Sequence, residues 1–191
     1  MKHTMVALVE DRPGVLNRVA SLFRRRGFNI DSLAVGTTEE TGVSRMTIVV
    51  EGHEGIVEQV EKQLYKLVDV IRVADLTGAE AVVRELALVK LACPTEQRAE
   101  LLDLIGIFRA HVVDVGPGHL MAELSAEADR MDAFLENVRP YGILEMVRTG
   151  RIGMLRGPET TAVNQEEPDD LERFHMESGR LPEGELPFVS D

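Results

Sequence analysis

The order of apolar patterns along the chain constrains the fold more than any other sequence feature, because one order of six segments occurs twice. Short runs rich in β-branched residues predict strands, and apolar residues three or four positions apart predict amphipathic helices. The first half gives strand, helix, strand, strand, helix, strand, written βαββαβ. Its strands are predicted at 3–9, 28–40, 42–52 and 69–76, and its helices at 15–27 and 56–67.

The first predicted helix illustrates the pattern. It ends at Gly27, a residue that readily takes the left-handed conformation of a helix cap. Arg24, Arg25 and Arg26 precede that glycine, where cations interact favourably with the helix dipole, and a solvated last turn is favoured over a contact with another protein. The face predicted to point inward comprises Val15, Leu16, Val19, Leu22 and Phe23.

The same order recurs in the second half of the chain. Two units of this kind predict an α+β fold with two ferredoxin-like βαββαβ units, each an antiparallel four-stranded sheet with two helices on one face. We expect the units at 1–78 and 79–157. In the second unit, strands are predicted at 85–92, on both sides of the 116–118 turn within 110–126, and at 142–150, with helices at 95–109 and 127–140.

Residues 158–191 differ in composition from the two units. This segment holds ten acidic residues against two arginines, four of the eight prolines, and no sustained apolar period. Such a segment cannot bury enough apolar surface to offset the entropy lost on ordering, so we predict a mobile acidic tail. A solubilising extension is the favoured interpretation. The alternative is a docking peptide anchored by Leu186, Phe188 and Val189.

Charge and cysteine content exclude several classes of function. A net charge of -12 over 191 residues argues against nucleic-acid binding, which needs clustered Lys and Arg. The single Cys93 cannot form an intramolecular disulfide. The N-terminal apolar run is too short, and too interrupted by charge, for a signal peptide or a membrane span. We therefore expect a cytoplasmic protein without a nucleic-acid or membrane partner.

The corner from Asp11 to Gly14, between the first strand and the first helix, is the candidate binding site. Gly14 has no Cβ, so an anion can closely approach the N–H groups of Gly14, Val15 and Leu16 at the positive end of the helix dipole. Pro13 would preset φ for the first helical turn. Alternatively, Asp11 caps the helix and the Pro-Gly pair only makes a tight turn; from the loop alone, this alternative is favoured.

Other residue types give no catalytic or metal site. Cys93 has no evident partner base, so burial in the core is favoured over catalysis. No pair of carboxylates is spaced for acid–base chemistry, and no glycine-rich phosphate loop is present. The histidines lack the spacing of metal ligands, and an ordinary structural role is expected for each: His3, His53, His111, His119 and His175.

The pattern Asp-x-Pro-Gly-Val-Leu at 11–16, with Gly-Phe-Asn-Ile at 27–30 after a helix, resembles the ACT domain, a small amino-acid-sensing module of the βαββαβ plan. Longer stretches are similar, in order, to the regulatory (small) subunit of acetohydroxyacid synthase, also called acetolactate synthase. The resemblance covers about residues 3–157 and not the acidic tail. The matching stretches are LVEDRPGVLNRVASLFRRRGFNIDSLAVGTTEETGVSRMTIVV, VEKQLYKLVDVIRVADL, RELALVKL and DAFLENVRPYGILEMVRTGRIGMLRG.

This resemblance implies an effector site shared by two chains. In the family, the ACT domains of two protomers pair, and a branched-chain amino acid, usually valine, binds between them. The resemblance implies that main-chain donors at Gly14, Val15 and Leu16 hold the effector carboxylate. Asn29 of the partner subunit would reach its polar groups, and Ile30 would meet its aliphatic side chain.

Asp11 stands where this family usually carries Asn, although Asp is frequent there in ACT domains at large. A carboxylate at this position could meet the ammonium group of an amino acid. Which branched-chain amino acid binds is not determined by the residues, because one methylene changes affinity by only about 1–3 kcal/mol.

The function implied by the resemblance is that of a non-catalytic regulatory subunit in branched-chain amino-acid biosynthesis. It would activate a large catalytic subunit and confer feedback inhibition by the amino acid. Thiamine diphosphate, Mg and FAD are expected in that catalytic partner, and no cofactor in this chain. The alternative is a stand-alone amino-acid sensor that regulates another enzyme or transcription; the acidic charge and the lack of a helix-turn-helix pattern count against it.

Overall fold

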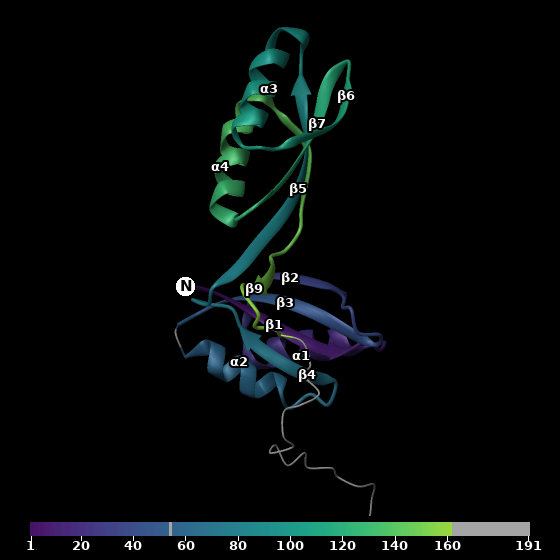
Figure 1. Cartoon of the computed structure of the whole chain (residues 1–191), viewed down its shortest axis with the longest axis vertical. Coiled ribbons are helices and arrows are strands. Elements are labelled where there is room, and N and C mark those ends of the chain that lie inside the picture. Colours follow the sequence, from purple (N-terminus) through teal and green to yellow (C-terminus); the bar gives the residue numbers. More distant parts are fainter. Residues whose placement is uncertain (54, 162–191) are drawn as a thin grey trace, which may run out of the picture.

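The computed structural model describes residues 1–53 and 55–161 and contains two units that follow one another along the long axis of the molecule (Figure 1). Each unit has an antiparallel sheet with α-helices on one face. The predicted α+β fold with two ferredoxin-like units is therefore confirmed. Most of the predicted acidic tail, including Leu186, Phe188 and Val189, lies outside the described residues. Within the described ranges, no helix is long and apolar enough to cross a membrane.

The N-terminal unit has the predicted element order. Its sheet has the strand order β2-β3-β1-β4, so β1 and β3 are central and β2 is an edge strand. β1 and β3 pair without a break, from Lys2 opposite Glu51 to Glu10 opposite Val43. The elements are β1 (Lys2–Glu10), α1 (Val15–Arg26), β2 (Asn29–Thr37), β3 (Val43–Glu51), α2 (Ile56–Leu64) and β4 (Val70–Asp75).

The two helices of this unit bury nearly the predicted faces. In α1 the prediction fails only at Leu16, which is 45% exposed, because the residue that follows Val15 is turned by about 100° around the helix and points away from the sheet. α2 ends at Leu64, so Leu67 packs against the core from outside the helix. The helix residues that are buried against the sheet are Val15, Val19, Leu22, Phe23, Ile56, Val60 and Leu64.

The C-terminal unit repeats the plan with one addition. Its sheet has the order β6-β7-β5-β8, and a fifth strand, β9, pairs with β5. The elements are β5 (Ala81–Cys93), the short 3-10 helix η1 (Thr95–Gln97), α3 (Arg98–Ile107), β6 (His111–Gly116), β7 (Gly118–Ala126), α4 (Ala128–Val138), the 3-10 helix η2 (Arg139–Tyr141), β8 (Ile143–Arg148) and β9 (Ile152–Leu155).

A compact apolar core lies between this second sheet and its helices. Met131 and Phe134 of α4 are fully buried, as predicted, and Leu135 is nearly so. In α3 only Leu101 and Ile105 are buried, whereas Leu102 is 42% exposed. Cys93 is fully buried in this cluster, which confirms its predicted structural role.

The prediction of four strands in the second sheet was wrong in two respects. β5 begins at Ala81 rather than at residue 85, and β9 was not predicted. The segment at 152–155 is short and contains a glycine, so it lacks the alternation that marks a strand. Residues 81–84 of β5 pair with β9, from Ala81 opposite Leu155 to Arg84 opposite Ile152. We call this two-stranded segment the β5–β9 ribbon.

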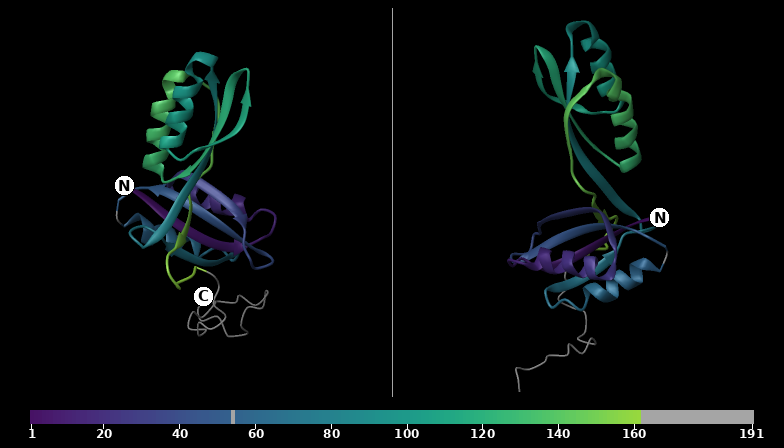
Figure 2. Two further views of the ribbon diagram at one scale, coloured as in Figure 1. Left: turned by 45° about the horizontal axis from the view of Figure 1, so that its top comes forward. Right: turned by 180° about the vertical axis from the view of Figure 1, so that it is seen from behind.

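The β5–β9 ribbon lies across the N-terminal sheet, on the face that its helices leave open (Figures 1 and 2). Arg45 of β3 donates from Nη2 to the carbonyl of Gly153 (2.5 Å), and the N–H of Arg151 donates to Ser32 Oγ (3.0 Å). A Cβ on Gly153 would come within 2.8 Å of Leu76 Cδ1, so a side chain here would have to displace the end of Leu76, next to β4. One continuous strand, β5, thus belongs to both units.

A buried charge cluster fixes the junction between the units. Glu85, 6% exposed, accepts from Arg148 Nε (2.5 Å) and from Arg151 Nε (3.1 Å), and Arg148 also donates from Nη1 to Asp132 (2.6 Å). Burial alone would lower the pKa of Arg148, but its bonds to Glu85 and Asp132 outweigh this effect and raise it. The chain that leaves β8 is therefore held against β5 at the point where β5 passes from one unit to the other.

Candidate functional site

The corner between β1 and α1 has the geometry of an anion site built from main-chain donors. Gly14 precedes the first helical residue and has φ 90° and ψ −9°, a left-handed conformation that residues with a side chain rarely adopt. The N–H groups of Gly14 and Leu16 meet no acceptor in the described part of the chain. The N–H of Val15 is only weakly engaged, by the carbonyl of Arg12 at 3.3 Å.

This geometry contradicts one part of the alternative interpretation, the capping of α1 by Asp11, while the bond from the N–H of Val15 to the carbonyl of Arg12 closes a tight turn. Asp11 is exposed, and no side chain caps α1; the left-handed Gly14 occupies the cap position instead. Because α1 begins at Val15, Pro13 lies before the helix and does not preset its first turn, which corrects that prediction. No acidic residue lies in the first turn of α1, so the positive end of the helix dipole is not neutralised there.

Two residues that sequence reasoning missed add a cation to this corner. Arg18, one turn into α1, donates from Nε and Nη2 to both carboxylate oxygens of Asp69 (2.6 and 2.7 Å). Asp69 is 5% exposed and holds the guanidinium plane in place. The remaining nitrogen, Nη1, lies 3.6 Å from the ideal Cβ position at Gly14. The pair is 51 residues apart in the sequence, so no local pattern could reveal it.

The two halves of the predicted site lie far apart within one chain. The N–H of Asp11 donates to the carbonyl of Gly42 (2.7 Å), which places the corner beside the turn between β2 and β3. Asn29 and Ile30 lie at the other end of β2, where Asn29 is opposite Glu51. Eight residue steps along a strand correspond to about 27 Å. A single chain therefore does not bring Asn29 to the Gly14 corner.

The free edge of the N-terminal sheet offers a way to join these halves. β2 is the outermost strand on that side, and no described segment pairs with its outer edge. If the β2 strands of two chains lay antiparallel about a two-fold axis, the Asn29 end of one would lie beside the Thr37 end of the other. Thr37 is opposite Ser44, next to the turn that touches Asp11. The geometry therefore suits a site made by two copies.

Titratable side chains elsewhere in the described part of the chain form no metal centre. Among residues 1–53 and 55–161, no group of three His, Cys, Asp or Glu side chains is arranged to hold a metal ion. His119 pairs with Asp114 at 3.3 Å on the β6–β7 hairpin. His3 is 3% exposed, and neither of its ring nitrogens has a hydrogen-bond partner in the described structure.

Comparisons with known proteins match both units. The family model for the AHAS small subunit-like ACT domain matches residues 5–72, and the model for the small subunit of acetolactate synthase matches residues 84–157. The "Probable acetolactate synthase small subunit" of Archaeoglobus fulgidus is 53% identical over 82% of this chain and 98% of its own length. The "Acetolactate synthase small subunit" of Mycobacterium bovis is 46% identical over 82% of this chain and 93% of its own.

A solved structure agrees with these relatives. The crystal structure of the acetolactate synthase small subunit from Thermotoga maritima superposes with a TM-score of 0.78 at 38% identity. The match covers 83% of this chain and 99% of that one, and so includes both βαββαβ units.

Proposed function

The chain belongs to the family of acetolactate synthase small subunits, and on that premise we propose how it regulates its enzyme. As a non-catalytic subunit, it activates a large subunit that uses thiamine diphosphate, with Mg and FAD, to condense pyruvate with pyruvate or 2-oxobutyrate. It also transmits feedback inhibition by a branched-chain amino acid, with valine the expected effector. The protein acts in the cytoplasm, in branched-chain amino-acid biosynthesis.

The effector binds at two Gly14 corners formed by a homodimer of N-terminal units. Its carboxylate accepts from the N–H groups at the start of α1, chiefly those of Gly14 and Leu16, with Val15 beside them. Arg18 supports that anion with its free Nη1. Asp11 meets the ammonium group, while Asn29 of the partner subunit and Ile30 of the partner subunit contact the polar groups and the aliphatic side chain.

The observation that carries this proposal is the left-handed Gly14, with unpaired N–H groups beside it, at a helix start that has no acidic residue. An unneutralised helix N-terminus attracts carboxylates, and the glycine lets one approach the backbone. The exposed edge of β2, which carries Asn29, supports pairing of two chains.

Reconstitution tests the regulatory part of the proposal. The purified chain is mixed with a large catalytic subunit, and acetolactate formation from pyruvate is followed with and without valine, leucine and isoleucine. We expect a higher rate when the chain is added and inhibition by at least one of the three amino acids. A rate that is unchanged by the chain at saturating ratios would contradict activation. Activation without any inhibition would contradict the effector proposal alone.

A further inference from the structure

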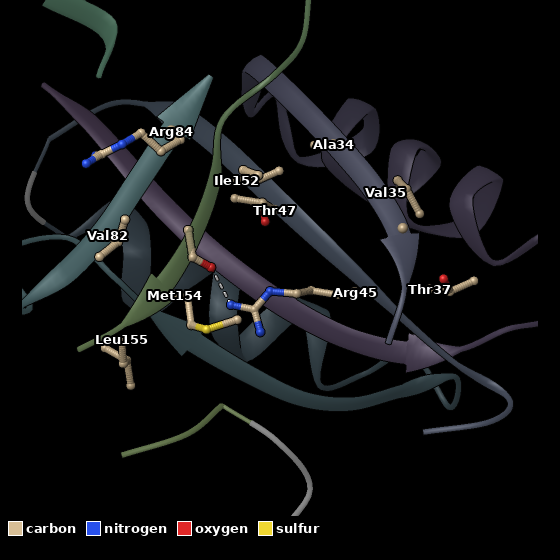
Figure 3. Close-up of a pocket in the computed structure, with 12 residues that line it drawn as sticks. Ala34, Val35, Thr37, Arg45, Thr47, Val82, Arg84, Ile152, Met154 and Leu155 are labelled. Atoms are coloured by element: carbon tan, nitrogen blue, oxygen red, sulfur yellow. Dashed lines mark hydrogen bonds between the residues drawn. The ribbon is translucent and has the colours of Figure 1, made fainter. Parts of the chain in front are cut away.

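The β5–β9 ribbon and the N-terminal sheet line an open cavity, of about 550 Å³, that the effector proposal does not use (Figure 3). It lies on the face of the sheet opposite α1 and α2, whereas the Gly14 corner lies on the helix side. Its volume lies within the range of small-molecule sites, which is about 300–1,000 Å³. Apolar residues form most of its wall: Ala34, Val35 through its backbone, Val82, Ile152, Met154 and Leu155.

Several of these apolar side chains are left open to solvent. Ile152 is 58% exposed and Met154 is 65% exposed, and both border the cavity, whereas the side chain of Val35 lies opposite Met46 on the helix side of the sheet. Figure 3 shows Ile152 and Met154 on β9 facing the side of the cavity formed by β2 and β3. An occupant would therefore cover apolar surface contributed by both the sheet and the ribbon.

Arg45 supplies a positive charge to this apolar cavity. Among residues 1–53 and 55–161, its guanidinium is bonded only to neutral oxygens, the carbonyl of Gly153 and the hydroxyl of Thr161, each at 2.5 Å. No carboxylate of the described residues lies within salt-bridge distance of it. Glu39, farther away, still has a favourable electrostatic interaction with the guanidinium. Burial lowers the pKa of Arg45, an effect that Glu39 partly offsets, but a guanidinium stays charged in proteins. The described residues use two of its five N–H donors and leave three.

The other arginine at the cavity differs in this respect. Arg84 pairs with Glu127 (3.0 Å) and also donates to the carbonyl of Val83 (2.7 Å), so its charge is already compensated. Among the described residues that line the cavity, none is acidic. An amino acid would thus find a partner for its carboxylate but none for its ammonium group, which would lose its hydration on entry.

We propose that this cavity binds a small aliphatic carboxylate without an amino group, held by Arg45 and by the apolar walls of β2 and the β5–β9 ribbon. Its selectivity is opposite to that of the Gly14 corner, where Asp11 can receive an ammonium group. Because β5 continues into the C-terminal unit, the occupant would contact a strand that both units share.

The test uses three probes with one carbon skeleton: 4-methylpentanoate, leucine and 4-methylpentylamine. Calorimetry is carried out on the full chain carrying Gly14→Val, so that the effector site does not contribute. We expect saturable binding of 4-methylpentanoate at one site per chain, and binding of leucine and of the amine at least about tenfold weaker. Leucine brings an ammonium group that meets no carboxylate among the described lining residues, and the amine has no carboxylate for Arg45.

Three further variants locate the site. Arg45→Met removes the charge and keeps an apolar side chain, so binding should fall by about tenfold or more. Ile152→Trp fills the cavity from an exposed position, leaves Arg45 intact and should also abolish binding. Arg84→Met removes a compensated charge from the same wall and should change the affinity by less than about threefold. Thermal unfolding of each variant confirms that it is folded.

Several results would overturn the proposal. These are the absence of saturable binding of 4-methylpentanoate, equal binding of leucine, or unchanged binding in both Arg45→Met and Ile152→Trp. Binding that appears only after residues 162–191 are deleted would also overturn it, because the acidic end of the chain itself would then be the occupant in the intact protein.

Discussion

The two units share one fold plan but differ at the corner that follows the first strand. In the N-terminal unit this corner is a left-handed Gly14, and α1 has no acidic residue in its first turn. In the C-terminal unit the chain passes through Pro94, with φ −61°, into a 3-10 turn and then α3, and the acidic Glu96 and Glu100 lie at these helix starts. A carboxylate ligand would be attracted to the first corner and repelled from the second.

The open faces of the two sheets differ as well. The N-terminal sheet is covered by the β5–β9 ribbon, and Val6, Thr47 and Val49 on that face are almost fully buried. The corresponding face of the C-terminal sheet has no such cover among the described residues, and Val147 on it is 60% exposed. One duplicated plan thus gives a unit whose sheet face is covered and a unit whose sheet face is open, because the ribbon that extends from the second unit covers only the first.

The variant with the largest expected effect is Gly14→Val, which alters the corner that distinguishes the N-terminal unit from the C-terminal unit. A Cβ at this position has room, at 3.6 Å from Arg18, but φ 90° is strained for valine by about 1–3 kcal/mol, and the isopropyl group would occupy the approach of the carboxylate. We expect the valine concentration for half-inhibition to rise about 100-fold, while activation largely survives. The matched change in the other unit, Thr95→Val, should leave inhibition unaltered. Unchanged inhibition in Gly14→Val would show that the effector binds elsewhere.

Glu85→Gln breaks the junction that joins the two units. Loss of this buried charge leaves Arg148 and Arg151 partly uncompensated, so we expect the free energy of unfolding to fall by about 2 kcal/mol. Glu127→Gln, in the exposed pair with Arg84, is the control and should cost less than about 0.5 kcal/mol. Urea unfolding measures both. Equal costs would mean that the junction cluster contributes no more than a surface ion pair.

Arg18→Met tests whether the cation beside Gly14 contributes to effector binding. It removes the cation next to Gly14 and leaves the main-chain donors, so effector affinity should fall by about five- to tenfold, less than in Gly14→Val. Asp69→Asn, which keeps Arg18 but weakens its orientation, should give a smaller loss in the same direction. Calorimetry with valine decides the order. A loss in Asp69→Asn that exceeds the loss in Arg18→Met would contradict the direct role of Arg18.

The smallest effect on stability is expected when the C-terminal segment is deleted. Thr161, assigned to the tail by sequence, is 5% exposed and accepts from Arg45, so at least this residue belongs to the body of the N-terminal unit. Deletion of 158–191 removes that bond and should cost about 1 kcal/mol, whereas deletion of 162–191 should leave the thermal midpoint nearly unchanged. A drop of more than a few degrees in the shorter deletion, or loss of the dimer, would show that residues 162–191 pack on the body.

Local patterns in the sequence predicted most of the fold and identified the corner where the effector site is proposed. Alternation and helical spacing located eight of the nine strands and all four α-helices, whereas the left-handed conformation of Gly14 was not predicted. The features that were not predicted depend on contacts between segments that are distant in the sequence. Arg18 meets Asp69 across 51 residues, and Glu85 meets Arg148 across 63, so neither pair has a local signal. β9 is too short, and contains a glycine, to show the alternating pattern of a strand. Its position depends on the contact with Arg45.

The central claim, that Gly14 of one chain and Asn29 of another form one effector site, is tested most directly with a mixed dimer. One chain carries Gly14→Val and the other carries Asn29→Ala. If the site is shared, one of the two sites in the mixed dimer has both lesions and the other has none, whereas neither parent dimer has an intact site. Calorimetry with valine on the separated mixed dimer should therefore recover about one binding event per dimer. Absence of binding, with the mixed dimer shown to be present, would contradict the shared site.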